Sequence, residues 1–141
     1  TTEWGMKYYW PRASVGRDGY VNVKSSVYNY PVQALATAEI IPLAVTFLWQ
    51  RLREANIDHM ARIVNTVHDS AILEVHPDHI EMVEQLAITA FTSDVYDYMH
   101  DVYGMKFIVP LGCGINTATH WGEGEEESYN VWPDGRLEKA A

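Results

Sequence analysis

The hydrophobic positions of this chain predict two long helices. Apolar residues recur at helical spacing from Pro31 to about Ala55, and Pro42 should kink or interrupt that helix. A second amphipathic stripe covers residues 78–103 and should end at Gly104, a residue type that suits the position just after a helix.

Period-two patterns predict the strands. Residues 62–75 contain two short runs rich in Ile and Val, separated by a turn, and they give the best hairpin signal in the chain. Residues 105–111 read as a third strand of the same antiparallel sheet, with the long helices packed on one face. A further hairpin is expected from residues 6–10 and 20–24. The fold class is therefore α+β.

Composition places the chain among single globular domains. It has 141 residues, of which 48% are hydrophobic, enough to build a core. The one cysteine, Cys113, cannot form an intrachain disulfide, and we see neither a secretory leader nor an unbroken membrane span. We therefore expect a cytoplasmic protein with no membrane partner. We expect a folded unit over residues 1–122 and a flexible acidic tail over residues 123–141.

The net charge of −9 argues against general nucleic-acid affinity, but the charges are unevenly distributed. Residues 61–141 hold fourteen acids and four bases, whereas residues 1–60 hold five acids and six bases. Arg12, Arg17 and Lys24 stand near several aromatic residues. That combination can contact phosphates and stack on bases, so these three residues are candidate DNA contacts.

The turn His68-Asp69-Ser70 joins the two runs of the predicted central hairpin. A carboxylate at the tip of a rigid hairpin is well placed to bind a hard cation such as Mg²⁺, which takes one or two protein carboxylates together with water and phosphate oxygens. The residues alone leave a second interpretation open, because Asp and Ser are also ordinary turn formers.

The order of several motifs resembles the C-terminal palm of family A DNA polymerases, the DNA polymerase I-like group that includes many phage replicases. In that family an Asn-x-Pro-x-Gln-Gly segment opens a helix, a strand ending in His-Asp-Glu follows on a hairpin, and a Val-Pro-Leu strand and a Gly-x-x-Trp-like ending come last. The corresponding segments here are NYPVQALATAEI at 29–40, RIVNTVHDSAILEV at 62–75, Val109-Pro110-Leu111, and His120-Trp121-Gly122. The resemblance covers residues 4–122.

The resemblance implies a role in template-directed nucleotidyl transfer to a primer 3′ end during DNA replication. Asp69 would be one of two aspartates that hold the catalytic Mg²⁺ ions, and His68 would lie near the primer terminus. Asn29 and Gln33 would contact the minor groove of the template-primer duplex. The implied partners are template-primer DNA, a deoxynucleoside triphosphate and the rest of a polymerase.

The sequence departs from the family pattern in ways that limit this reading. Ala34 replaces the glycine after Gln33, Ser70 replaces the usual glutamate, and Glu39 stands where aspartate is common. No first palm motif and no fingers helix are present in the chain, which begins with threonine. We therefore expect a fragment or one subunit of a split enzyme, inactive by itself, with the missing parts (first palm motif, fingers and thumb) supplied in cis or by a separate subunit.

Two other functions stay open from the residues alone. His68-Asp69 also suits an HD-type metal phosphohydrolase, although those enzymes place further His and Asp ligands on a mostly helical scaffold. A non-catalytic α+β interaction module, in which the acidic tail recruits a basic partner, is the alternative outside enzymes.

Overall fold

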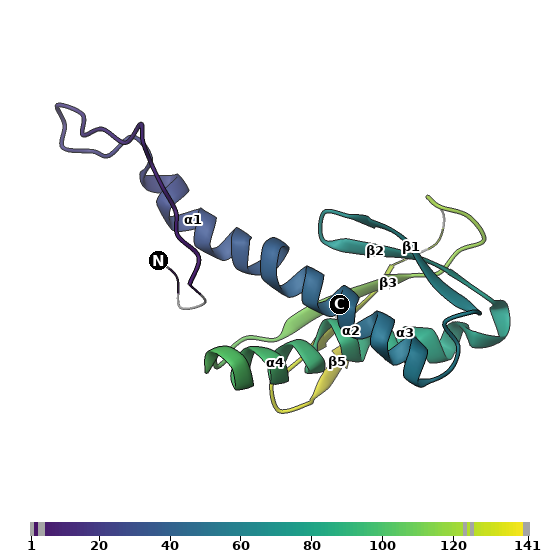
Figure 1. The fold of residues 1–141 in the computed structure, drawn as a ribbon. Helices are drawn as coiled ribbons and strands as arrows, with labels where there is room; N and C mark the ends of the chain where they lie inside the picture. Colours follow the sequence, from purple (N-terminus) through teal and green to yellow (C-terminus); the bar gives the residue numbers. More distant parts are fainter. Residues whose placement is uncertain (1, 3–4, 123, 125, 140–141) are drawn as a thin grey trace.

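The structure is a computed structural model that describes residues 2, 5–122, 124 and 126–139. It confirms the α+β class: a long helix leads into a body of two further helices, a β-hairpin and a small three-stranded sheet (Figure 1). The helices are α1 (Lys24–Ala34), α2 (Ile41–Glu54), α3 (Ile80–Phe91) and α4 (Ser93–Tyr103). The strands are β1 (Ala61–Val67), β2 (Ser70–Val75), β3 (Leu111–Asn116), β4 (Glu126–Val131) and β5 (Leu137–Lys139).

The long helix begins seven residues before the predicted start and runs through both prolines. A π-helical segment, Leu35–Ile40, separates α1 from α2 and lies directly before Pro42, which stands in the first turn of α2. Proline lacks an N–H group and its ring collides with the carbonyl four residues earlier, so a locally widened helix relieves the conflict. The expected interruption at Pro42 therefore takes the form of a π segment. Pro31 is tolerated inside α1, where no residue is buried and a freed carbonyl can bind water.

The same helix is the one candidate membrane span among the described residues. The stretch Lys24–Glu54 is long and apolar enough to cross a bilayer, a test that core helices of soluble proteins also pass. Its second half, α2, buries Ala44, Leu48 and Leu52 against the body of the protein, while only 11% of the apolar window as a whole is buried.

The core forms on both sides of α2. Leu48 and Leu52 pack with residues of α3 and of the hairpin base, including Ala61 and Val83. Ala44 packs with α4, in particular with Val95 and Met99, none of which is exposed. Both predicted amphipathic helices thus bury the face that the sequence pattern indicated.

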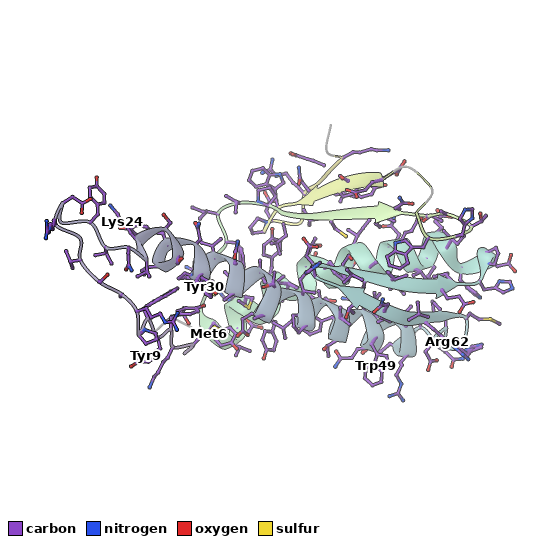
Figure 2. All side chains as sticks on the ribbon, turned by 90° about the horizontal axis from the view of Figure 1, so that it is seen from above. Met6, Tyr9, Lys24, Tyr30, Trp49 and Arg62 are labelled. Carbon is purple, nitrogen blue, oxygen red and sulfur yellow. The ribbon has the colours of Figure 1, made fainter. Side chains whose placement is uncertain are left out.

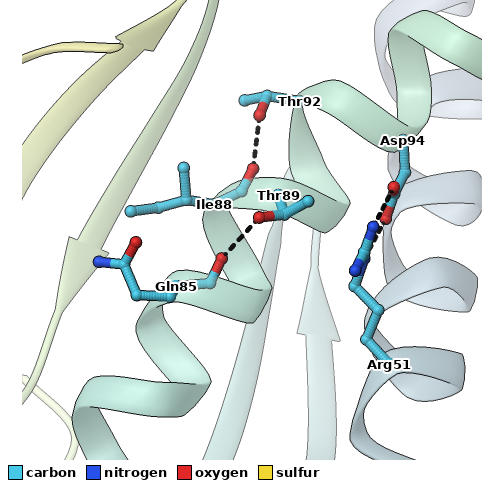
Figure 3. A network of polar contacts seen from close by, with 6 residues as sticks. All are labelled: Arg51, Gln85, Ile88, Thr89, Thr92 and Asp94. Atoms are coloured by element: carbon cyan, nitrogen blue, oxygen red, sulfur yellow. Dashed lines mark hydrogen bonds and ion pairs between the residues drawn. The ribbon is translucent and has the colours of Figure 1, made fainter. Parts of the chain in front are cut away.

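The second predicted helix is interrupted at Thr92, so that α3 and α4 are separate. A short 3₁₀ turn, Pro77–His79, precedes α3, and α4 ends at Gly104, whose left-handed φ of 66° confirms the predicted stop. At the break, the fully buried Thr92 donates its hydroxyl to the Ile88 carbonyl at 2.6 Å (Figure 3). Such a bond satisfies a carbonyl that the broken helix leaves free.

An ion pair also joins α4 to α2. Arg51 donates to both carboxylate oxygens of Asp94 at 2.5 Å (Figure 3). The hydrogen bonds that Arg51 donates to Asp94 raise the pKa of the Arg51 guanidinium, which stays charged at every accessible pH. This two-pronged pair fixes how α4 lies along α2.

The prediction of an N-terminal hairpin is wrong. Residues 6–10 and 20–24 do not pair as strands, and one isolated bridge, Val15 to Val21, is all that forms. The aromatic rings of this segment prefer the helix: Tyr8 and Trp10 meet Tyr30 of α1 edge to face, with ring centroids 6.0 and 5.1 Å apart.

The C-terminal prediction is also corrected. The third strand begins at Leu111, where the predicted one ended, because Pro110 has no N–H to give to a ladder. It pairs with β4, which in turn pairs with β5, in a sheet separate from the hairpin, so the single sheet we expected is two sheets. Within the segment that we expected to be a flexible tail, residues 126–131 and 137–139 therefore form strands.

Acidic residues of that tail are paired within the sheet. Tyr129 and Lys139 both donate to the Glu127 carboxylate, at 2.6 and 2.9 Å, and these bonds lower the pKa of Glu127. Val131 is buried at the end of β4. The segment is held by its pairing with β3 and by the hydrogen bond that Tyr96 of α4 donates to the Val131 carbonyl.

Candidate functional site

The central hairpin forms as predicted, and His68 and Asp69 occupy its two-residue turn, whereas Ser70, which we expected in the turn, begins β2. Val67 pairs with Ser70, and His68 has a left-handed φ of 53°. Two-residue hairpin turns need a positive φ at their first central position so that the turn matches the twist of the strands. Ser70 donates its hydroxyl to the Val67 carbonyl at 2.9 Å, which closes the turn.

The hairpin is anchored at its base and free at its tip. Ala61 is buried, and Ile63, Leu73 and Val75 pack on the core formed with α2 and α3. The amide of His76 donates to the Met60 carbonyl at 2.8 Å and closes the base. Residues 68–70 are all exposed. A rigid stem therefore carries an accessible carboxylate.

The Asp69 side chain makes no hydrogen bond or ion pair with any described residue. An exposed, uncommitted carboxylate on a rigid turn fits the ligand chemistry of Mg²⁺, which accepts one or two protein oxygens and keeps water or phosphate for the rest. Within the described ranges, no group of three or more His, Cys, Asp or Glu side chains could hold a metal ion. Asp69 can thus supply one ligand to a site that needs further ligands from elsewhere.

Asn29 and Gln33 lie on one face of α1, since residues four apart in a helix are neighbours. Both are exposed, and the Gln33 carbonyl accepts a hydrogen bond from Thr37 at 2.8 Å. Their side-chain amides can donate to and accept from the minor-groove edges of bases. Ala34, the next residue after Gln33, is half-buried.

Arg12 and Arg17 lie in the loop that precedes α1, and Lys24 is the first residue of that helix (Figure 2). All three are exposed. The loop stands at the end of α1 that is far from the body of the protein (Figures 1 and 2). We expected this cluster on a β-hairpin, but the structure places Arg12 and Arg17 on an irregular loop and Lys24 at the start of α1.

The candidate residues thus fall into three groups on three elements. The loop cations, the amide pair of α1 and Asp69 are not joined by any hydrogen bond or ion pair. In Figure 1 the turn of the hairpin points toward the half of the view into which α1 projects. A duplex or a protein partner that contacts α1 would therefore approach the end of the molecule that carries Asp69.

Sequence reasoning missed one feature of this surface, a shallow pocket where the loop meets α1. Tyr20, Lys24 and Tyr28 are among the residues that line it. Lys24 and Tyr28 are four residues apart, a spacing that places two side chains side by side on a helix. We did not use this spacing because we expected Lys24 to end a strand.

No protein-family model, no curated protein and no solved structure matches this chain.

Proposed function

We propose that this chain is the C-terminal palm part of a DNA-directed DNA polymerase of the family A type. In this role it supplies Asp69 to a two-metal Mg²⁺ site and contacts the template-primer duplex through Asn29 and Gln33. The remainder of the polymerase brings the other metal-binding aspartate and the groups that select the nucleotide, either in cis or as a separate subunit.

The observation that supports the proposal best is the hairpin. The motif His68-Asp69 sits in an exposed two-residue turn, on a stem whose base is buried in the core. When bound, Mg²⁺ would neutralise charge on the oxygens that take part in phosphoryl transfer. Asp69 would hold such a cation at a fixed place, and the strained backbone of His68 would orient the turn.

The alternatives have less support. An HD phosphohydrolase gathers its His and Asp ligands on helices, whereas His68 and Asp69 lie on a β-turn. A module that recruits partners through a loose acidic tail is disfavoured because Glu127 is paired with Lys139 inside a sheet.

Substituting Asp69 tests the proposal. In the polymerase assembled from this chain and the polypeptide with the first palm motif and fingers, Asp69→Asn should keep the fold and DNA affinity, because Asn has nearly the same shape. It should lower single-turnover nucleotide incorporation with Mg²⁺ by about three orders of magnitude or more, the scale expected when a charged ligand of a phosphoryl-transfer metal is lost. His68→Ala should have an intermediate effect, and Ser70→Ala a mild one.

Glu74→Gln is the matched control, since Glu74 is an exposed carboxylate on the same hairpin. It should incorporate nucleotide at the wild-type rate. If Asp69→Asn also does so, the hairpin has no metal-binding role and His68-Asp69 is an ordinary turn.

A further inference from the structure

The pocket at the start of α1 is a second surface with defined chemistry. It lies between the loop of residues 18–21 and the first two turns of α1, and its lining includes Tyr20, Lys24, Val27 and Tyr28. Both tyrosines expose about two-thirds of their surface, 65% and 67%. The Lys24 ammonium lies 5.4 Å from the centre of the Tyr20 ring. Two open aromatic rings and a cation thus share one small site.

The loop that carries Tyr20 is braced by its own hydrogen bonds. Gly16 donates its amide to the Tyr20 carbonyl at 2.8 Å, and Asn22 bonds to the backbone of both Ser14 and Arg12. Gly19 adopts a positive φ of 78° that permits the tight turn. The Tyr20 ring is therefore presented from a fixed loop.

One acidic group, Asp18, also lines the pocket. Its carboxylate accepts a hydrogen bond from the Tyr20 amide at 3.1 Å, so it serves the turn. In the sequence, residues 5–38 carry four bases and only this one acid, whereas the rest of the chain is strongly acidic. The pocket lies in the one part of the molecule whose charge attracts phosphate.

Two ligand classes would meet this chemistry differently. In a duplex the faces of the bases are covered by stacking, so a duplex could use the cations but not the rings. In a single strand each base has an open face that stacks on tyrosine, while the phosphates contact lysine and arginine. Exposed rings directly beside a cation therefore favour a single strand.

We propose that this pocket binds single-stranded DNA, with bases on Tyr20 and Tyr28 and a backbone phosphate on Lys24. This site lies beyond the proposed polymerase role of Asp69, Asn29 and Gln33, and it needs no metal ion. Its occupant is an unpaired strand, distinct from the duplex that the amides of α1 would contact.

The test uses the full chain and a fluorescein-labelled oligothymidylate of about 20 nucleotides. Fluorescence anisotropy is measured in EDTA over a series of salt concentrations, so that no step depends on the metal site. Tyr28→Ala and Tyr20→Ala should each weaken binding about tenfold, the size of one lost base stack. Lys24→Gln should make the plot of log affinity against log salt shallower by about 0.7, the share of one single-strand phosphate contact.

The chain provides a matched control on α2. Trp49 is a 49% exposed ring with the Arg53 guanidinium 4.9 Å from its centre, and it lies outside the basic segment. Trp49→Ala should leave binding unchanged, and circular dichroism should show that all variants keep the wild-type helix content. An unlabelled hairpin duplex should compete at least tenfold less well than unlabelled oligothymidylate.

Three outcomes would overturn the proposal: no binding of the oligonucleotide at low salt, equal losses in Tyr28→Ala and Trp49→Ala, or equal competition by the duplex. The last would show that charge alone attracts DNA here. None of these outcomes bears on Asp69, whose test measures incorporation by the assembled enzyme.

Discussion

At the scale of single residues, the lone thiol shows how burial can remove a group from chemistry. Cys113 lies half-buried on β3, and burial, with a smaller contribution from the Glu126 carboxylate, raises the pKa of the thiol to about 11. The thiolate is the reactive form, so Cys113 is inert near neutral pH. The raised pKa therefore argues against a nucleophilic role for Cys113 at neutral pH.

Thiol labelling should reveal that raised pKa. The reaction of Cys113 with an aromatic disulfide reagent should be slow at pH 8 and should rise about tenfold per pH unit until the pH approaches the pKa of the thiol. Unfolding in guanidinium should make the reaction fast at pH 8, because the solvated thiol regains its ordinary pKa. A rate in the folded protein that levels off below pH 9 would contradict the assignment. The chain has no other cysteine, so the signal belongs to one site.

At the scale of elements, one hydroxyl connects α4 to the C-terminal sheet. Tyr96 is buried. Its hydroxyl accepts a hydrogen bond from the Leu111 amide and donates one to the Val131 carbonyl at 2.6 Å. The first bond lies at the start of β3 and the second at the end of β4. A single side chain therefore fixes where this sheet sits on the helices.

Tyr96→Phe should consequently destabilise the protein by about 2 kcal/mol, because it leaves an amide and a carbonyl without their partner. The free energy of unfolding from a urea titration measures this loss. Tyr98→Phe is the control on the same helix, since the Tyr98 hydroxyl makes no hydrogen bond within the described part of the chain. Equal stability of the two variants would show that the Tyr96 hydroxyl bonds contribute nothing.

The elements also show what a sequence can and cannot predict. The hairpin with Asp69 at its tip was predictable because alternation, β-branched residues and turn formers agree there. The strands β4 and β5 were not, since their Glu, Ser and Asn content reads as solvated tail and their pairing depends on distant β3. The N-terminal segment was misjudged because Tyr8 and Trp10 suit a strand locally but pack on Tyr30. That error also hid the pocket at Lys24.

At the scale of the whole molecule, the basic residues and the hairpin that carries Asp69 lie on different parts of the protein. The loop before α1 and α1 itself project from the body (Figure 1). Residues 5–38 carry four bases and one acid, and Tyr20 and Tyr28 in this segment are exposed. The body carries most of the carboxylates, and Asp69 extends from it on the hairpin. The DNA binding and the metal-assisted chemistry that we propose would therefore reside on separate elements, and one could be retained while the other is lacking.

It follows that the purified chain should bind single-stranded DNA and yet fail to extend a primer. Metal-assisted phosphoryl transfer needs several fixed anionic ligands, and the described residues offer one exposed carboxylate at the hairpin tip without companions. The measurement is primer extension with Mg²⁺ and all four deoxynucleoside triphosphates over a range of chain concentrations, with the Asp69→Asn chain purified in parallel to reveal contaminating polymerase. Extension that rises with wild-type concentration and vanishes in Asp69→Asn would show that the chain assembles a complete site by itself. Extension that is the same in both preparations belongs to a contaminant, and its removal should leave DNA binding intact, because the basic segment and the hairpin tip act independently.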